Sequence, residues 1–470
     1  MKSELVCWGY PDRPALVTQS GEVVTYGQLR EHVRRCARSL PAGDLVFLVG
    51  QNDFTSISLY LACLEVGAVP LLLSRDLSPE AFLSLFRTYR PAHLILPKDL
   101  PFDGEGFDVR ETFGEYVCIS SRICVGPMLH PDLAVLLATS GSTGSPKLVR
   151  LSLVNIVANA RSIVEYLGIG PDERAVTSLP FNYSYGLSVV NSHLNAAASL
   201  AVTHRSLVDP GFWQQVSSQR VTSMAGVPYS YDMLLRLRWE RMDLPSLRTM
   251  TQAGGRMETA KKLQVHEVCK SRGMDFFSMY GQTEATARIA YVSPAHLERR
   301  PASIGGAIPG GRLWVEDEAG NCLDVPDEVG ELVYSGPNVA LGYATRREDL
   351  ARGDDWQGRL RTGDLARRDA DGFFFIEGRR HRFLKVFGVR VSLDSVEDWF
   401  STHGLVAAAH GRDDMLRVSV ELGDETDLRA CAHSLARALS IHPTALRISS
   451  LAALPRLSSG KVDYPCLSTM

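Results

Sequence analysis

LVFLVGQNDFTSISLYLACLEVGAVPLLL, residues 45–73, contains two apolar runs that flank one segment of helical length. Leu45 to Val49 and Val69 to Leu73 are short and apolar, which is typical of buried strands. Ser56 to Gly67 lies between them and ends in a glycine, a common stop signal of helices. The order strand, helix, strand predicts a parallel pair of strands joined by a crossover helix.

The same alternation continues through the first three-quarters of the chain. Leu133 to Ala138 is another buried-strand run, and Ser152 is a suitable cap for a helix with Ile156, Ala160 and Ile163 on one face. Two later runs end at loops rich in glycine, and they are Leu247 to Gln252 and Asp275 to Met279. We therefore predict an α/β protein built on largely parallel sheets, with ligands bound at the strand-end loops.

The last third of the chain has a different pattern of predicted strands, helices and turns. From about residue 305, short strands and glycine turns alternate, and after Gly378 the pattern becomes hairpin, helix and strand. The prediction is a large N-terminal domain, residues 1–377, with a β-rich subdomain over about 305–377. A small, mobile α+β lid follows over residues 378–470.

Composition limits the classes of function. Of 470 residues, 45% are hydrophobic and 22% charged, a balance typical of globular enzymes and not of disordered chains. The formal charge of −3 gives no overall attraction to polyanions, so we expect no nucleic-acid partner.

Neither end of the sequence nor its cysteines indicate export. Met1 to Trp8 lacks a basic start with an apolar core, and no apolar run is long enough to span a membrane. Nine scattered cysteines form no zinc-like spacing, which favours reduced thiols. The expected location is the cytoplasm.

One segment combines the groups that a polyphosphate needs. Thr139-Ser-Gly-Ser-Thr-Gly-Ser-Pro-Lys147 joins hydroxyls, two glycines and a lysine, so its backbone N–H groups, hydroxyls and Lys147 can all face phosphate oxygens. Ser145 and Pro146 precede the lysine, so the segment differs from the Walker loop. Taken alone, it is equally consistent with a flexible Ser/Gly turn.

Four later segments carry further candidate side chains. An aromatic and a lone acid follow a strand in Tyr280-Gly-Gln-Thr-Glu284, and Thr362-Gly-Asp364 offers a carboxylate for a ribose. A basic run extends from Gly378 to Gly388, and Ser459-Gly-Lys461 lies near the end of the chain. Each of these also occurs as an ordinary turn or solvated surface.

In this order, the five segments resemble the adenylate-forming superfamily of acyl-CoA synthetases, peptide-synthetase adenylation domains and luciferases. Weaker similarity includes Thr25 to Leu29, Leu64 to Pro70 and Gly330 to Pro337, and it extends over nearly the full chain. The resemblance implies an acid–thiol ligase that uses ATP and Mg²⁺. The enzyme would first form an acyl-adenylate and pyrophosphate. It would then transfer the acyl group to coenzyme A or to the 4'-phosphopantetheine of a carrier protein.

The resemblance also implies roles for individual residues. Lys461 and Thr283 would be catalytic, Glu284 would bind Mg²⁺ and His381 would be the hinge, where Asp or Lys is usual. Lys385 and Gly388 would serve the thiol step. The implied nucleotide-binding residues are Thr139, Ser140, Gly141, Ser142, Thr143, Gly144, Lys147, Gly254, Gly255, Tyr280, Gly281, Asp364 and Arg379.

The substrate remains open among several acids. By analogy the acyl pocket would contain Asn182, Tyr183, Gly226 and Met279. Asn182 stands where members that activate amino acids carry Asp, and a buried substrate ammonium would need such a carboxylate. This favours a fatty, hydroxy or aryl acid. The alternatives are a stand-alone enzyme that adenylates amino acids and a non-catalytic nucleotide-binding relative.

Overall fold

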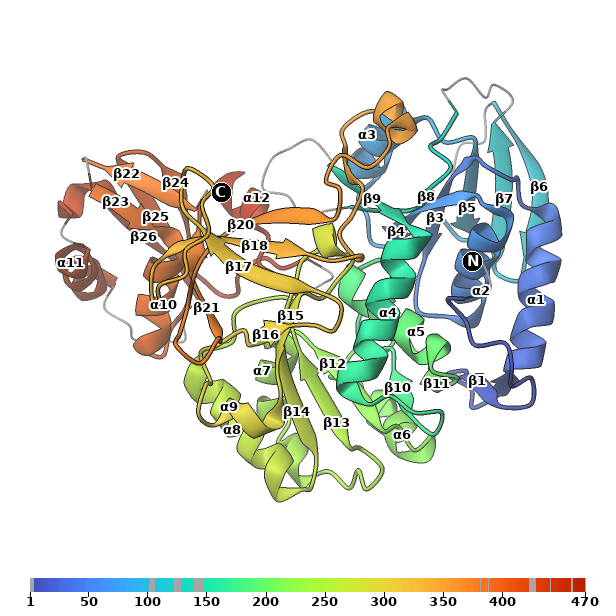
Figure 1. The fold of residues 1–470 in the computed structure, drawn as a ribbon, viewed down its shortest axis with the longest axis horizontal. Coiled ribbons are helices and arrows are strands. Elements are labelled where there is room, and N and C mark those ends of the chain that lie inside the picture. Colours follow the sequence, from blue (N-terminus) through green and yellow to red (C-terminus); the bar gives the residue numbers. More distant parts are fainter. Residues whose placement is uncertain are drawn as a thin grey trace.

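The computed structural model describes residues 4–100, 106–121, 128–138, 147–380, 382–387, 389–421, 428–439, 441–457 and 460–469. Figure 1 shows two large sheets with helices between and around them, and a smaller C-terminal part at the left. The predicted α/β class, with a β-rich region and a further α+β part, is confirmed. The division at residue 377 stays a prediction.

The first large sheet has eight strands among the described residues. Its parallel centre pairs β5, β3, β4 and β8, while β9, β19, β7 and β6 join in antiparallel fashion. The order is β19 (Gly342–Ala344), β9 (Leu148–Ser152), β8 (Leu133–Ala138), β4 (Val69–Ser74), β3 (Leu45–Gly50), β5 (His93–Pro97), β7 (Tyr116–Ser121) and β6 (Phe107–Phe113).

The second large sheet has nine strands within the same described ranges. Six neighbouring strands of this sheet pair in parallel, in the order β1, β11, β10, β12, β13 and β14. Antiparallel strands close both edges. The order is β16 (Gly306–Ala307), β15 (Ala290–Val292), β14 (Asp275–Tyr280), β13 (Thr249–Gln252), β12 (Ser223–Gly226), β10 (Arg174–Val176), β11 (Ser199–Ala201), β1 (Pro14–Val17) and β2 (Val23–Thr25).

Helices cover both faces of each sheet. Between the sheets lie α4 (Leu153–Leu167) and α5 (Ser184–Asn195), whose apolar side chains share one core with both sheets. The outer face of the second sheet is covered by α6 (Pro210–Ser218), α7 (Pro228–Arg236), α8 (Thr259–Ser271) and α9 (Pro294–Leu297). The first sheet packs against α1 (Tyr26–Ser39), α2 (Phe54–Val66) and α3 (Pro79–Tyr89).

The apolar run Leu45 to Val49 explains why helices lie on both faces of the first sheet. Successive side chains of a strand point to opposite faces. In β3, Val46 and Leu48 enter the core between the sheets, whereas Phe47 and Val49 enter the core on the opposite face. Both faces are therefore buried, and the strand is continuously apolar rather than alternating.

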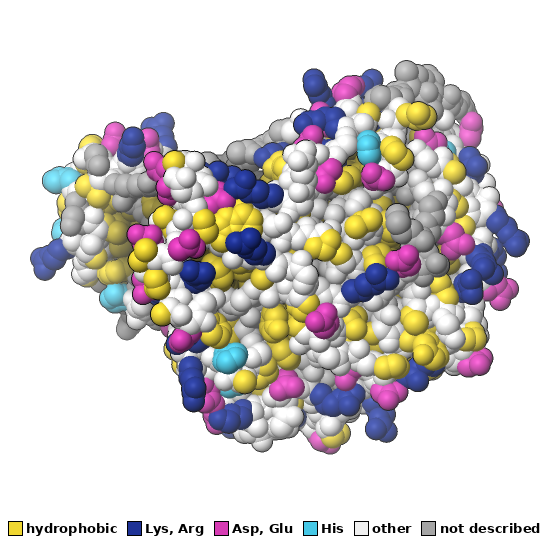
Figure 2. Space-filling view, viewed as in Figure 1, with side chains coloured by type: hydrophobic (Ala, Val, Ile, Leu, Met, Phe, Trp, Pro, Cys, Tyr) yellow, Lys and Arg dark blue, Asp and Glu magenta, His cyan; other side chains and the backbone are white. Residues whose placement is uncertain are grey.

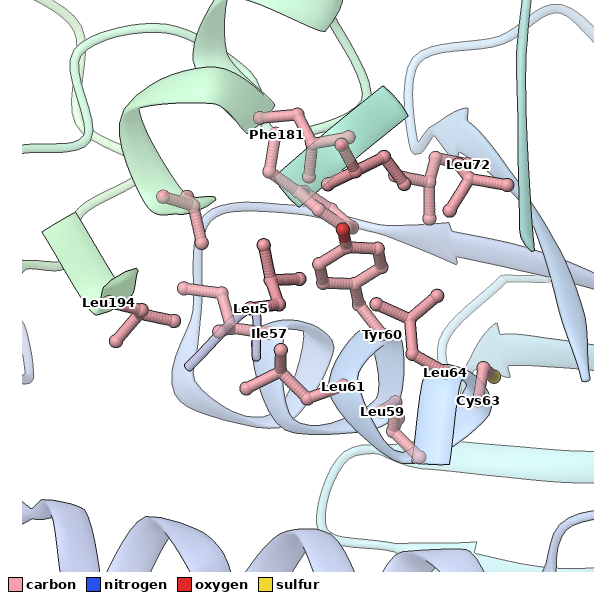
Figure 3. Packing of buried hydrophobic residues seen from close by; sticks show 14 of the residues in the cluster. Leu5, Ile57, Leu59, Tyr60, Leu61, Cys63, Leu64, Leu72, Phe181 and Leu194 are labelled. Atoms are coloured by element: carbon pink, nitrogen blue, oxygen red, sulfur yellow. The ribbon is translucent and has the colours of Figure 1, made fainter. Parts of the chain in front are cut away.

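The predicted helix of this unit begins earlier than expected and ends as expected. Asp53 caps its start by accepting a bond from the Ser56 amide, and Gly67 adopts the left-handed conformation at its end. Figure 3 shows Tyr60 of α2 packed against Phe181 and Leu72 from other elements. The Tyr60 hydroxyl also donates to Oδ1 of Asn191 on α5, at 3.2 Å. These contacts fix the start of α5 against the first sheet.

Strands of the β-rich region also pair with strands of the two large sheets. Its own four-stranded sheet contains β17 (Arg312–Glu316), β18 (Gly330–Ser335), β20 (Arg359–Arg368) and β21 (Phe374–Arg379). However, β16 pairs with the nine-stranded sheet and β19 pairs with β9 of the eight-stranded sheet. Residues 305–377 therefore connect the two large sheets.

The C-terminal part has its own apolar core. Strands β22 (Phe383–Val386) and β23 (Val389–Ser392) form a hairpin, and α10 (Leu393–Thr402) follows. The remaining elements are β24 (Val406–Arg412), β25 (Met415–Glu421), α11 (Leu428–Ala438), β26 (Leu446–Leu451) and α12 (Tyr464–Thr469). The pattern of hairpin, helix and strand predicted after Gly378 corresponds to these elements.

On the face shown in Figure 2, basic and acidic side chains are interspersed and form no large patch of one sign. Within the described part of the chain, no helix is both long and apolar enough to cross a membrane.

A buried histidine on α5 makes the fold sensitive to acid. Burial lowers the pKa of His193 to about 4, and the Arg288 guanidinium acts in the same direction. An unfolded histidine has a pKa of about 6.5, so the unfolded chain binds more protons between these values. The stability from neutral His193 is full above pH 6.5 and lost as pH falls toward 4. Urea unfolding of the wild type should lose up to about 3 kcal/mol over this window.

The variant His193→Gln should show a flatter dependence of unfolding free energy on pH over the same range. A substitution of the exposed His403 by glutamine is the matched control and should leave the slope unchanged. Equal slopes for wild type and His193→Gln would contradict the assignment.

Candidate active site

The candidate site lies where three parallel strands of the second sheet end. After β13, Gln252 to Gly255 form a loop in which Gly254 has φ of +82°. A Cβ at Gly254 would lie 2.4 Å from the Tyr183 hydroxyl, so both backbone conformation and space require glycine there. Gly255 follows beside Pro228 at the start of α7. The backbone thus approaches the site closely.

The segment after β14 provides the acid and a hydroxyl. Gly281 has no room for a side chain, because a Cβ would lie 1.9 Å from the Ala287 carbonyl oxygen. Thr283 and Glu284 lie on a single 3₁₀ turn, and Oγ1 of Thr283 is 3.0 Å from Oγ of Ser184 at the start of α5. This contact joins the strand-end loop to the central helix layer.

Glu284 is held by a residue that the sequence did not suggest. The Tyr343 hydroxyl on β19 donates to Oε1 of Glu284 at 2.7 Å. On the same ring, the Lys147 ammonium lies 3.9 Å from the centroid, a cation–π contact. Only the pairing of β19 with β9 brings Tyr343 here, so no local pattern in the sequence could have identified it.

Asp364 and Arg379 face each other across two strands of the small sheet. They are register partners on β20 and β21, and Arg379 Nε lies 3.2 Å from an Asp364 oxygen. The Tyr280 hydroxyl donates to the same carboxylate. Asp364 is only 5% exposed, and burial raises its pKa while Arg379 opposes the rise. Tyr280, Asp364 and Arg379 therefore form one connected group beside the strand ends.

Lys461 reaches this site from the C-terminal part. Its Nζ lies 5.3 Å from the centroid of the Tyr183 ring. Burial lowers the pKa of Lys461, Arg379 lowers it further, and the Glu284 carboxylate opposes the shift. The lysine is thus near both the acid after β14 and the basic group on β21.

Two contacts hold the lysine's turn on the N-terminal part. The Arg456 guanidinium lies over the Tyr229 ring at 4.7 Å, and a Cβ on Gly460 would be 2.9 Å from Val227 Cγ2. On α10, Asp398 forms an ion pair of 2.7 Å with Arg256, just after the Gly254 loop. The C-terminal part is therefore closed over the strand ends with Lys461 inside.

The predicted acyl-pocket residues lie around the start of α5. Asn182 and Tyr183 are half-buried in the turn before this helix, and Gly226 ends β12. Met279 is buried one residue before Tyr280, and its sulfur accepts a hydrogen bond from the Tyr166 hydroxyl at 3.0 Å. Thr283 contacts Ser184, the residue after Tyr183, at the start of this helix. That the four residues line one acyl pocket stays a prediction.

Other predicted residues are not part of this cluster or are not described. Lys385 lies on β22, where its backbone N–H donates to Asp413 at 2.8 Å, and Figure 1 draws this hairpin at the far left of the molecule. The following predicted residues lie outside the described residues: Thr139, Ser140, Gly141, Ser142, Thr143, Gly144, His381 and Gly388.

Glu284 is the candidate metal ligand of this site. Among the described residues, no three His, Cys, Asp or Glu side chains are arranged to hold a metal by themselves. Glu284 is a single carboxylate oriented by Tyr343, with Lys147 beside it. Mg²⁺ commonly uses one or two carboxylates together with substrate phosphates, so these residues fit Mg²⁺ that arrives with a nucleotide.

Comparison with known proteins identifies the family. A family model described as AMP-binding enzyme matches residues 5–344, well over half of the chain. The chain belongs to the AMP-binding enzyme family. The predicted membership in the adenylate-forming superfamily is thereby confirmed.

Relatives of this AMP-binding enzyme include ligases of different acids. It is 29% identical to the medium-chain fatty-acid–CoA ligase of Escherichia coli strain K12, covering 96% of this chain and 87% of the relative. It is 30% identical to a feruloyl-CoA synthase of an Amycolatopsis species, covering 77% and 75%. The fold matches that of Bacillus subtilis O-succinylbenzoate coenzyme A synthetase with ATP and magnesium ion, with TM-score 0.77, 24% identity and coverage of 96% of each chain.

Proposed function

We propose that this protein is an ATP-dependent acid–thiol ligase. It activates a carboxylic acid as an acyl-adenylate, releases pyrophosphate, and then transfers the acyl group to a thiol of coenzyme A or of a carrier-protein pantetheine. The observation that carries the proposal is the placement of Lys461 among Tyr183, Glu284 and Arg379 at the strand ends. The named CoA ligases among the relatives support the same reaction.

In the first step, a carboxylate oxygen attacks the α-phosphorus, and the bond from that phosphorus to the bridging oxygen breaks. Two anions must approach while charge develops on the phosphate oxygens. A fixed cation in a water-poor site therefore stabilises the transition state more than the ground state. Lys461 supplies that cation, and Thr283 supplies a hydroxyl donor beside it. Burial of Lys461 strengthens its interaction with an incoming anion.

The remaining described residues divide between the parts of the nucleotide. Lys147 binds the outer phosphates together with the loop that contains Thr139 to Gly144. Tyr280 and the backbone of Gly254 and Gly255 form the adenine side, and Gly281 lets the chain after Tyr280 pass close to the Ala287 carbonyl. Asp364 accepts the ribose hydroxyls, and Arg379 keeps that carboxylate ionised. Among the described residues, the pairing of Asp364 with Arg379 and the lack of space for a side chain at Gly254 support these roles.

Glu284 is the proposed ligand for Mg²⁺, which would neutralise phosphate charge when bound. Replacing Tyr343 by phenylalanine removes the hydroxyl that holds Glu284 but keeps the ring beneath Lys147. Loss of such an orienting partner typically costs 10–100-fold in metal affinity. We expect Tyr343→Phe to raise the Mg²⁺ concentration for half-maximal pyrophosphate exchange by about tenfold or more.

The matched control is Tyr89→Phe, which removes a buried hydroxyl bonded to the carbonyl of Ala344, the neighbour of Tyr343. That variant should keep the wild-type Mg²⁺ dependence. An unchanged Mg²⁺ dependence in Tyr343→Phe would argue against Glu284 as the metal ligand.

The second step requires a different position of the C-terminal part. Here the Lys461 turn is seated on Val227, while the hairpin bearing Lys385 lies elsewhere. We propose that rotation about His381 withdraws Lys461 and brings Lys385 and Gly388 to the thiol's pantetheine arm. The cation–π contact of Arg456 with Tyr229 and the exposed ion pair of Asp398 with Arg256 are weak enough to exchange.

The acid is proposed to be a fatty, hydroxy or aryl acid, since Asn182 provides no carboxylate for a substrate ammonium. A carrier protein is a candidate acceptor, because one relative is a phenyloxazoline synthase, although this chain covers only 40% of its length. We place the reaction in the cytoplasm. The deciding test is ATP–pyrophosphate exchange over fatty, hydroxy, aryl and amino acids, followed by thiol assays with coenzyme A and pantetheinylated carrier protein. Exchange with none of the acids would refute the proposal.

A further inference from the structure

A narrow cavity lies below the candidate site, along the helix that carries Ser184. Its wall includes Val189 of α5, Ala225 of β12, Thr251 of β13 and two charged side chains, Arg288 and Glu173. Ala225 and Thr251 precede the ends of their strands, so the cavity lies further from the strand ends than the Gly254 loop does. An acyl group that extends from the strand ends along α5 would therefore run toward the cavity.

Arg288 is buried, yet its described partners are all neutral. The residue is 2% exposed. Its Nη1 donates to the Tyr166 hydroxyl at 2.9 Å and to the Met279 sulfur at 3.4 Å, and the guanidinium lies 5.0 Å from the Tyr185 ring centroid. Among the residues that the structure describes, Nε has no hydrogen-bond partner and no carboxylate forms an ion pair with this guanidinium.

The one acid that shares the cavity wall is already engaged. Glu173 forms an ion pair with Arg248 at 3.0 Å and accepts a bond from the Thr222 hydroxyl. The neighbouring His193 is neutral at pH 7 because its pKa is about 4. By contrast, Arg150, another buried arginine, is ion-paired with Asp355. Burying a charge without a counter-charge is costly. An anionic group of a ligand would supply the counter-charge that Arg288 lacks among the described residues.

Two short links connect Arg288 to the reacting end of the site. Tyr185, which the guanidinium faces, follows Ser184, whose hydroxyl contacts Thr283. Met279, which the guanidinium also contacts, directly precedes Tyr280. A substrate that places one end beside Thr283 and Lys461 would therefore reach Arg288 by extending along α5.

We propose that Arg288 binds a second carboxylate of the substrate, so that the acid activated here is a dicarboxylic acid. The inference rests on the proposed function and narrows it to acids with an anionic far end. The guanidinium fork suits a carboxylate because two parallel N–H groups can donate to its two oxygens, and Nε is one of them. The second carboxylate is not chemically changed; it is recognised while the first attacks ATP.

The test compares acids that differ only at the far end. Pyrophosphate exchange is measured with hexanoate, adipate and monomethyl adipate, and with octanoate and suberate, using the full-length protein. Each hydrogen bond to a charged group contributes about 1.5–3 kcal/mol, so we expect kcat/KM to be about 10–100-fold higher for the diacids. The neutral ester should behave like the monoacid.

Variants assign the preference to Arg288. Arg288→Met should remove most of the diacid preference while exchange with monoacids persists, and Arg288→Lys should retain part of it. A saturable rise in melting temperature with adipate, present in wild type and absent in Arg288→Met, gives a readout independent of catalysis. Should Arg288→Met not fold, the wild-type acid series and Arg288→Lys still decide the matter.

The outcomes separate the two proposals. Exchange with monoacids but no preference for diacids in wild type overturns the role of Arg288 and leaves the ligase activity standing. An equal loss of diacid and monoacid exchange in Arg288→Met, with normal folding, also overturns it. Exchange with no acid refutes the ligase activity, and the dicarboxylate substrate falls with it.

Discussion

Replacing Lys461 by alanine is expected to lower acid-dependent pyrophosphate exchange by on the order of 10² or more, the cost of losing one preorganised donor to a developing charge. The side chain lies within the field of Glu284 and Arg379, 5.3 Å from the centroid of the Tyr183 ring, and the nearby cation Arg379 is already paired with Asp364. Because the turn is seated through Arg456 and Gly460, truncation at Lys461 should leave closure intact. The measurement is single-turnover formation of acyl-adenylate at saturating ATP.

Lys270→Ala is the control, since Lys270 is an exposed lysine on α8 paired with Glu298. It should exchange pyrophosphate at the wild-type rate. The thiol step offers a second check: chemically supplied acyl-adenylate should still be consumed by Lys461→Ala in the presence of the acceptor. Unchanged exchange in Lys461→Ala would remove the lysine from the first step.

Arg150→Met should cause the largest loss of stability, about 3–5 kcal/mol, the usual cost of removing one member of a buried ion pair. Arg150 on β9 is fully buried and ion-paired with Asp355. Its guanidinium also donates to the carbonyls of Tyr343 at 3.2 Å, Leu341 at 3.0 Å and Gly353 at 3.0 Å. Methionine fills similar space but removes these three donors, although the Leu341 carbonyl keeps the Asp355 backbone N–H as a donor at 2.8 Å.

Urea unfolding followed by circular dichroism measures the change. Arg161→Met is the matched control, because Arg161 is 59% exposed and its pair with Glu4 contributes little. A loss below about 1 kcal/mol for Arg150→Met would show that the segment around Asp355 is held by other contacts.

Local patterns explain which parts of the fold were predictable. The strands β3, β4 and β8 and the caps at Ser152 and Gly67 follow from short-range periodicity and cap chemistry, and each lies where expected. The placement of Tyr280 and the Gly254 loop at strand ends followed from the same reasoning. These features depend on residues that are close in sequence.

Long-range pairing explains what was missed. The strand β9 was not predicted, because after a Ser/Gly-rich loop a five-residue run can equally continue into the helix that follows. Tyr343 gains its role only because β19 pairs with β9. Arg288 did carry a signal, since it is a single arginine in the apolar stretch Ala287 to Val292. Its meaning depends on burial and absent counter-charge, which sequence alone does not give.

The pairing of β19 with β9 separates two properties of the enzyme. It places Tyr343 on β19 beside Lys147, which directly precedes β9 of the first sheet, whereas the cavity around Arg288 is walled by α5 and by strands of the second sheet. Phosphate binding through Lys147 and acid selectivity through Arg288 would thus rest on different sheets, although Tyr280 and the Gly254 loop also lie at strand ends of the second sheet. Substitutions at Arg288 would therefore change the acid that is accepted without moving Lys147 or Tyr343.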